Sequence, residues 1–99
     1  MKFQYEPELL EFMQKKGQTT ILVELVEVNS DIDVTELHVR LIDDKMREVF
    51  LTKKGYRRFA SEVGDVLLPP YPLTMEETVT FGLKSFLFIK YVTHKGMKV

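Results

Sequence analysis

The segment after residue 52 combines basic and aromatic side chains in a way that could bind a polyanion. Its sequence is Lys-Lys-Gly-Tyr-Arg-Arg-Phe, so four cations are interleaved with two aromatic rings. Cations that track phosphates, next to rings that stack on bases, form a typical surface for single-stranded nucleic acid. The residues that would form this RNA or polyanion site are Lys53, Lys54, Tyr56, Arg57 and Arg58. The alternative is a surface segment whose rings are buried and whose cations lie in water.

A second candidate site lies in a polar segment nearer the N-terminus. Asp31 and Asp33 alternate along the chain, and His38 follows them. Carboxylate oxygens bind hard cations, and an imidazole could add a nitrogen ligand. The segment lacks the glycine and the terminal glutamate of a calcium loop. These residues predict a metal carrier with oxygen ligands as one alternative. The other is a solvated turn whose Asp side chains bond to their own backbone.

Catalytic motifs are scarce in this chain. It contains no cysteine, so it has no thiolate nucleophile and no sulfur ligand for a metal. His38 and His94 are its two histidines, and neither belongs to a recognisable nucleophile motif. The five glycines are scattered rather than grouped into a phosphate loop. We therefore predict a protein that is not an enzyme and has no cofactor.

Aromatic residues crowd the C-terminal part of the chain. Phe81, Phe86, Phe88 and Tyr91 lie within two predicted strands, and the run Phe-Leu-Phe-Ile makes both faces of a strand apolar. Such residues either form the core of a small sheet or leave one face as a surface for a partner. The core interpretation is favoured, because a small sheet needs aromatic side chains to hold it together. An exposed edge strand could pair with a second copy in a homodimer.

Length and charge narrow the class of protein. The 99 residues predict a single domain, residues 1–99. Fourteen basic and fifteen acidic residues argue against a dedicated DNA-binding protein, which needs a basic excess. No apolar run approaches the roughly 20 residues of a membrane-spanning helix. The N-terminus turns acidic where a signal peptide would be apolar. We expect a cytoplasmic protein with no membrane association.

Local patterns predict a helix followed by a long strand. Pro7 suits the first position of a helix over residues 7–16, and Gly17 suits a left-handed end. Apolar side chains within this range recur at spacings of three and four. Residues 19–28 then predict a strand with apolar residues on both faces. This pattern indicates a central strand that the N-terminal helix covers on one side.

The remaining predicted elements are short strands. Residues 36–42 alternate, with Leu37, Val39 and Leu41 on one face. Residues 53–63 have apolar side chains at helical spacing but form a short segment, so their structure is left open. Gly96 is expected to turn the C-terminal tail. Other predicted strands cover residues 48–52, 66–68, 78–83 and 86–93.

Two stretches of the chain resemble the HesB-like group, the small bacterial proteins of iron–sulfur biosynthesis type. They are the helix ending in Lys-Lys-Gly with its following strand, residues 7–28, and the C-terminal stretch from Thr78 to Val99. The Cys-Cys or Cys-selenocysteine members of that group are the most similar. Their thiol pair follows the first long strand, where this chain has Asn29 to Asp33 and no cysteine. The resemblance therefore implies a fold without the family's ligands.

Together these patterns predict an α+β domain in which an N-terminal helix packs on a mostly antiparallel, curved sheet. The function we predict is that of a non-catalytic binding protein with a HesB-like fold and an unidentified protein partner. An RNA or polyanion binder and a metal carrier are the alternatives from other classes.

Overall fold

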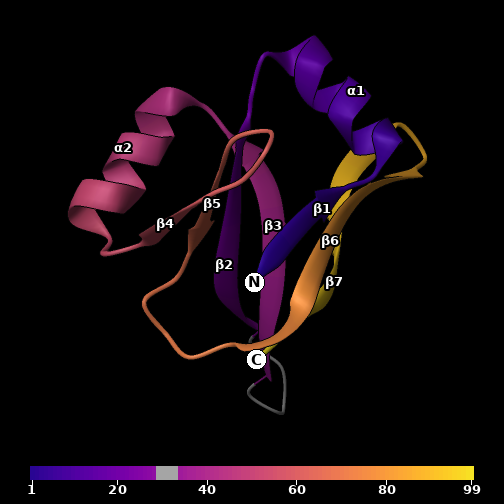
Figure 1. Cartoon of the computed structure of the whole chain (residues 1–99). Helices are drawn as coiled ribbons and strands as arrows, with labels where there is room; N and C mark the ends of the chain where they lie inside the picture. Colours follow the sequence, from indigo (N-terminus) through magenta and orange to yellow (C-terminus); the bar gives the residue numbers. More distant parts are fainter. Residues whose placement is uncertain (29–33) are drawn as a thin grey trace.

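The computed structural model of the protein describes residues 1–28 and 34–99 (Figure 1). Its described part is α+β, with two helices and two mixed sheets of mostly antiparallel strands. The elements in chain order are β1 (Lys2–Tyr5), α1 (Pro7–Lys16), β2 (Thr20–Val28), β3 (Val34–Ile42), α2 (Asp44–Lys53), β4 (Arg57–Ala60), β5 (Asp65–Leu68), β6 (Thr74–Phe86) and β7 (Ile89–Lys98). The predicted α+β class is confirmed, whereas the single predicted sheet is divided into two.

The two sheets differ in size and strand order. The smaller has the order β1-β6-β7, with β1 parallel and β7 antiparallel to β6. The larger has the order β3-β2-β5-β4, in which β2 is antiparallel to β3 and parallel to β5. The strand predicted over residues 19–28 is therefore central, as its two apolar faces indicated.

A continuous apolar core joins the two sheets and α1. Its buried side chains come from α1, from strands of the larger sheet and from β6 and β7 of the smaller one. Phe81 on β6 is fully buried and lies against two aromatic rings of β1, those of Phe3 and Tyr5. The ring centroids are 5.9 Å and 5.7 Å from that of Phe81. The core members are Leu9, Met13, Ile21, Val23, Val39, Val66, Leu68, Val79, Phe81 and Met97.

A second apolar cluster lies between the larger sheet and α2, and it corrects one prediction. Phe50 on α2 belongs to one buried cluster with Leu22 of β2, whereas the side chains of α1 belong to the core on the other face of β2. Residues 48–52, predicted as a strand, belong to this helix. The Asp43 side chain caps its first turn by accepting a hydrogen bond of 2.8 Å from the Met46 amide. This cap and the burial of Phe50 outweigh the strand preference of Val49 and its neighbours.

Two further strands form through contacts that local patterns do not reveal. Residues 53–63, whose structure the sequence leaves open, contain β4, because Phe59 pairs with Val66 of β5. The N-terminal strand β1 has no counterpart among the predicted elements. It pairs with β6 over four residues, and the Tyr5 hydroxyl is hydrogen-bonded to that of Ser61 at 2.7 Å. In both cases contacts distant in the sequence determine the structure.

The β6–β7 hairpin is longer than predicted. Strands were expected over residues 78–83 and 86–93, which placed a break at the polar pair Lys84-Ser85. The ladder instead continues through both residues to the pair Phe86–Ile89. Gly96, expected to turn the tail, lies inside β7 where the register with β6 shifts between Met75 and Thr80. The turn of the hairpin is therefore formed by apolar residues.

Neither of the two helices in the described part of the chain is long and apolar enough to cross a membrane. This finding agrees with the absence of a long apolar run in the sequence.

We predict that Gly96→Ala destabilises the hairpin strongly. Gly96 has a φ of +94°, and a methyl group there would lie 2.6 Å from the Thr78 carbonyl oxygen. The free energy of unfolding should fall by about 2–3 kcal/mol in urea denaturation. Gly17→Ala is the control, because Gly17 also has a positive φ but nothing within 4 Å of the added methyl group. Its loss should be near 1 kcal/mol, from the left-handed backbone alone. Equal losses would mean that the contact with Thr78 is unimportant.

Candidate functional site

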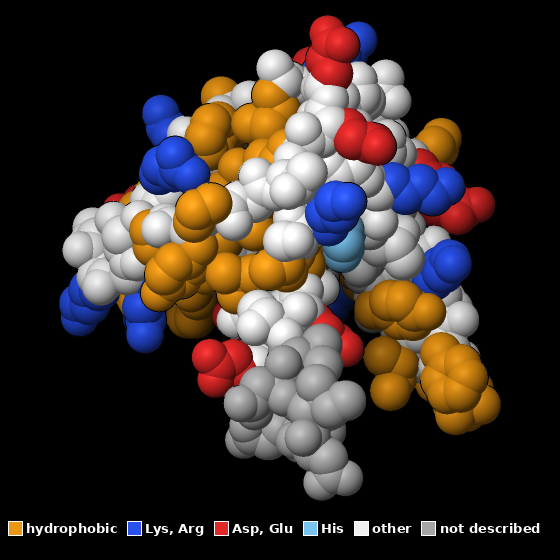
Figure 2. Space-filling model, turned by 90° about the horizontal axis from the view of Figure 1, so that it is seen from below, with side chains coloured by type: hydrophobic (Ala, Val, Ile, Leu, Met, Phe, Trp, Pro, Cys, Tyr) orange, Lys and Arg blue, Asp and Glu red, His pale blue; other side chains and the backbone are white. Residues whose placement is uncertain are grey.

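The turn of the β6–β7 hairpin exposes four consecutive apolar side chains, which we call the apolar tip. Figure 2 shows hydrophobic side chains grouped at the right-hand edge of the molecule, the side on which the hairpin projects in Figure 1. Phe88 is as exposed as in an extended peptide. The exposed fractions are 68% for Phe86, 81% for Leu87, 101% for Phe88 and 67% for Ile89. Contiguous apolar exposure of this kind marks an interaction site more often than a scattered hydrophobic residue does.

The backbone of the apolar tip is strained. Leu87 and Phe88 form a two-residue turn between the paired residues Phe86 and Ile89, and the φ of Leu87 is +57°. A two-residue hairpin turn with a positive φ at its first position normally has glycine there. Because a leucine carries a Cβ, this conformation costs about 1–2 kcal/mol. Leucine and phenylalanine at this turn are therefore explained neither by the residue preferences of hairpin turns nor by solubility.

Lysines lie directly behind the apolar tip on both faces of the hairpin. Lys84 pairs with Tyr91 across the strands, and Lys90 pairs with Ser85 one position nearer the turn. Side chains of adjacent residues point to opposite faces of a strand, so the two lysines lie on different faces. The stretch from residue 78 to residue 99 contains four lysines and neither Asp nor Glu. The hairpin is therefore apolar at its end and positively charged behind it.

The C-terminal end of α1 adds to this charge. The Lys90 ammonium lies 5.7 Å from the centre of the Phe12 ring, and the Lys16 ammonium lies 5.2 Å from the same centre. Both distances are within cation–π range, so each lysine lies close to the Phe12 ring. Lys15 is paired with Glu11 at 3.6 Å on the same helix. The base of the apolar tip and α1 thus form one surface, which also carries Glu8 and Glu11.

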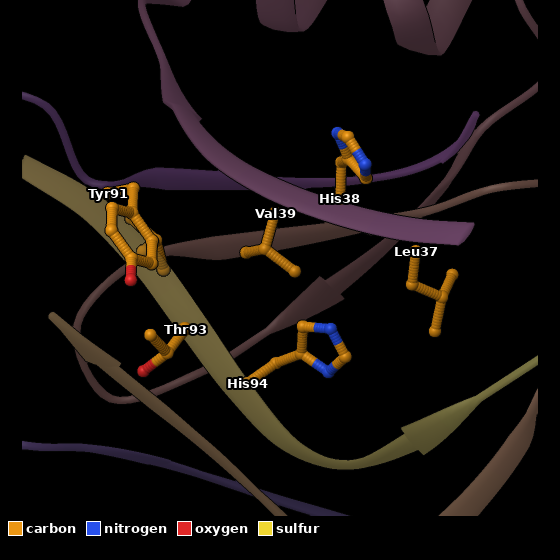
Figure 3. Close-up of a pocket in the computed structure, with 7 residues that line it drawn as sticks. Leu37, His38, Val39, Tyr91, Thr93 and His94 are labelled. Carbon is orange, nitrogen blue, oxygen red and sulfur yellow. The ribbon is translucent and has the colours of Figure 1, made fainter. Parts of the chain in front are cut away.

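A cavity of about 400 Å³ lies farther along the hairpin, between β7 and β3 (Figure 3). Leu37 and Val39 point from β3 toward the ring of His94 on β7, whereas His38 points to the opposite side of β3. The Nδ1 atom of His94 is buried and has no hydrogen-bond partner among the described residues. The lining is mixed, with apolar side chains beside those of Tyr91, Thr93 and His94, and the two imidazoles diverge, so they do not converge on one point in this cavity.

The predicted metal site is only partly described. Asp31 and Asp33 lie outside the described residues, so their proposed role stays a prediction. His38 is exposed on β3, and its Nε2 atom lies 3.2 Å from a carboxylate oxygen of Glu36. Within residues 1–28 and 34–99, no three His, Asp or Glu side chains are grouped so as to hold a metal ion.

The predicted polyanion site is divided by the fold. Lys53 and Lys54 are exposed at the end of α2. Arg57 and Arg58 are adjacent on β4 and so point to opposite faces of the sheet. The Arg58 guanidinium lies 3.9 Å from the Asp65 carboxylate, and that of Arg57 lies 5.9 Å from the centre of the Phe59 ring. The four cations therefore do not form one continuous surface.

Tyr56, the proposed stacking ring, has a structural role. Its ring packs edge-on against that of Phe50, with the centroids 4.9 Å apart. Burial raises the pKa of the Tyr56 hydroxyl, and the negative charge of Glu24 raises it further. This ring is a partly buried member of the cluster under α2. It corresponds to the alternative considered for this segment, in which the aromatic side chains are buried.

The sequence favours a core role for the aromatic residues of the C-terminal strands, with a surface for a partner as the alternative. The core role is correct for Phe81, whereas Phe86 and Phe88 are exposed, as in the alternative. The available signal was the run of four apolar residues itself. A strand with both faces apolar has to be covered on both sides, and no second helix had been predicted to cover this one.

Comparisons of the chain with protein-family models, with curated proteins and with solved structures found no match. The HesB-like resemblance therefore stays a prediction from the sequence, and the geometry of the site supplies the argument about function.

We predict that Leu87→Gly stabilises the protein. Glycine removes about 1–2 kcal/mol of backbone strain from the folded protein at this position. The greater conformational freedom of glycine in the unfolded chain lowers the free energy of unfolding by about 0.5–1 kcal/mol, which offsets part of this gain. The free energy of unfolding should therefore rise by roughly 0.5–1 kcal/mol in urea denaturation. A Leu83→Gly control lies within the regular ladder, where no positive φ is relieved, and should destabilise. A loss of stability in Leu87→Gly would contradict the assigned strain.

Proposed function

We propose that this protein is a non-catalytic binding protein and that the apolar tip is its binding element. The observation that carries the proposal is the full exposure of Phe88 at the end of a long hairpin whose ladder is regular from Thr80 to the turn. Burying a phenylalanine side chain contributes about 1.5–3 kcal/mol, so a ring left in water is available for contact with a partner.

The strain at Leu87 supports the same proposal. Strained backbone conformations persist where the surrounding structure enforces them, and they are concentrated at functional positions. The turn could be made from polar residues with no loss to the core, because the apolar tip belongs to neither of the two core clusters. Its residues have no contribution to folding that would account for them.

The non-catalytic part of the proposal rests on the sequence, which offers no cysteine and only two histidines. The HesB-like fold, the cytoplasmic location and a homodimer remain predictions beside it. A metal carrier that uses Asp31 and Asp33 also stays a prediction. The polyanion alternative is weakened by the opposite orientations of Arg57 and Arg58.

Site-specific photo-crosslinking in the native cells tests the proposal. A photo-reactive amino acid at position 88 should give a discrete adduct, whether with a protein or with a lipid. The matched control carries the same group at Tyr71, an exposed aromatic residue on the connector between β5 and β6. Adducts at position 88 and none at position 71 are expected. Absence of adducts at 88, or the same adducts at both positions, would refute the apolar tip as the binding element.

A further inference from the structure

The arrangement of residues along the hairpin changes in a fixed order from its turn to its base. The apolar tip comes first, and the pairs Ser85–Lys90 and Lys84–Tyr91 follow it. Strands rise about 3.4 Å per residue, so the Lys84–Tyr91 pair lies about 10 Å behind the turn. Beyond this pair the side chains of β6 become buried, as far as the fully buried Phe81.

This order matches the layers of a bilayer surface. Apolar groups that lie at the interface reach about 5–10 Å into the boundary between headgroups and acyl chains. Tyrosine is enriched at the headgroup level, where its ring is partly buried and its hydroxyl is solvated. Lysines at that level place their ammonium groups among lipid phosphates while their aliphatic stems lie along apolar surface. In this arrangement the apolar tip lies at the depth of the acyl boundary, and Lys84, Lys90 and Tyr91 lie at the depth of the headgroups.

Charge restricts which surface the hairpin could contact. Residues 78–99 carry four lysines and no acidic residue, whereas residues 1–77 carry ten basic and fifteen acidic residues. Anionic lipids attract basic groups near the surface, about fivefold in binding for each group. The lysines of the hairpin are attracted to an anionic surface, although Glu8 and Glu11 of α1 line the same hollow as Lys90. The small net charge of the whole chain, −1, conceals this division.

A second copy of the chain is a poorer occupant. In a symmetric dimer the same patch contacts itself, so tip-to-tip contact would bring Lys84 and Lys90 of both copies together. No Asp or Glu of residues 78–99 is present to compensate them. Like charges brought together at an interface oppose association.

From these observations we propose that the apolar tip inserts into the surface of an anionic lipid bilayer, with Lys84, Lys90 and Tyr91 at the headgroup level. This inference rests on the proposed function and names its partner. It differs from the expectation of no membrane association, which was based on the absence of an apolar run long enough for a membrane-spanning helix. A hairpin that enters only the boundary layer of the bilayer needs no such helix.

Vesicle co-sedimentation tests the inference. The full-length protein is mixed with vesicles of phosphatidylcholine and phosphatidylserine, and separately with vesicles of phosphatidylcholine alone. We expect sedimentation with the anionic vesicles, and weaker sedimentation at high salt.

Phe88→Ser should lower the partition coefficient about tenfold or more, since one buried phenyl ring is lost. Lys84→Gln and Lys90→Gln should each lower it about fivefold. Tyr71→Ser, an exposed aromatic residue elsewhere, should leave it within about twofold.

A tryptophan reporter measures insertion directly. The chain contains no tryptophan, so Phe88→Trp introduces a single fluorophore at the apolar tip. Its emission should shift to shorter wavelength on addition of anionic vesicles, and lipids brominated on their acyl chains should quench it. A single tryptophan introduced by Tyr71→Trp should show neither effect. Unchanged emission from position 88 would overturn the inference, as would vesicle binding that is insensitive to Phe88→Ser.

The failures of this inference and of the proposed function are distinguishable. A protein adduct at position 88 without vesicle binding would overturn the inference and leave the apolar tip as a binding element. A dimer in sedimentation equilibrium that Phe88→Ser dissociates would overturn it in favour of a second copy. Failure of both vesicle binding and crosslinking would overturn the inference together with the proposed function.

Discussion

The buried Phe81 ring attaches the β6–β7 hairpin to the rest of the molecule. It belongs to the core that the two sheets share, and it packs against the two aromatic rings of β1. Phe3 stacks on this ring and Tyr5 packs against it at an angle, while the Glu6 amide donates a hydrogen bond of 2.9 Å to the Phe81 carbonyl oxygen. Aromatic contacts of this kind add about 0.5–1.5 kcal/mol beyond the area they bury. Because the base is fixed, the outer part of the hairpin can project without contributing to the core.

The outer part of the hairpin is organised by a different requirement. Its ladder is regular, so the backbone hydrogen bonds are satisfied as far as the turn. The four side chains of the apolar tip are nevertheless of the kind found in a buried segment, and one of them is a leucine at positive φ. In these four residues, backbone strain lowers the stability of the protein and apolar exposure lowers its solubility in water. A partner surface that buries the apolar tip removes the cost of apolar exposure, and for this reason the binding function is assigned to the apolar tip.

The sequence predicted those elements whose signals are local. The helix over residues 7–16 was predicted correctly, because Pro7 begins it and Gly17 ends it with a φ of +65°. The long strand that follows was also identified, because both its faces are apolar. The assignment of residues 48–52 to a strand was wrong, since that segment is helical only through the Asp43 cap and the contact of Phe50 with Leu22. Contacts across the fold cannot be deduced from the preferences of five residues.

The candidate site was harder to predict for the same reason. Phe81 and Phe88 have the same side chain and lie in one apolar segment, and only the position of the turn separates a buried residue from an exposed one. A polar pair, Lys84-Ser85, was a more typical turn than Leu87-Phe88. Tyr56 is the opposite case, because this ring was a candidate for stacking on bases but packs in the apolar cluster under α2. The sequence contained the residues of the site, and the register of one hairpin determined their roles.

The most direct test of this account compares alanine substitutions of those two phenylalanines. The free energy of unfolding should fall by about 3–5 kcal/mol in Phe81→Ala, because a fully buried ring is removed from the core. In Phe88→Ala it should change by less than about 0.5 kcal/mol, because the ring is exposed. Urea denaturation followed by circular dichroism gives both values. A comparable loss in the two variants would show that Phe88 belongs to the core, and it would contradict the assignment of the apolar tip to binding.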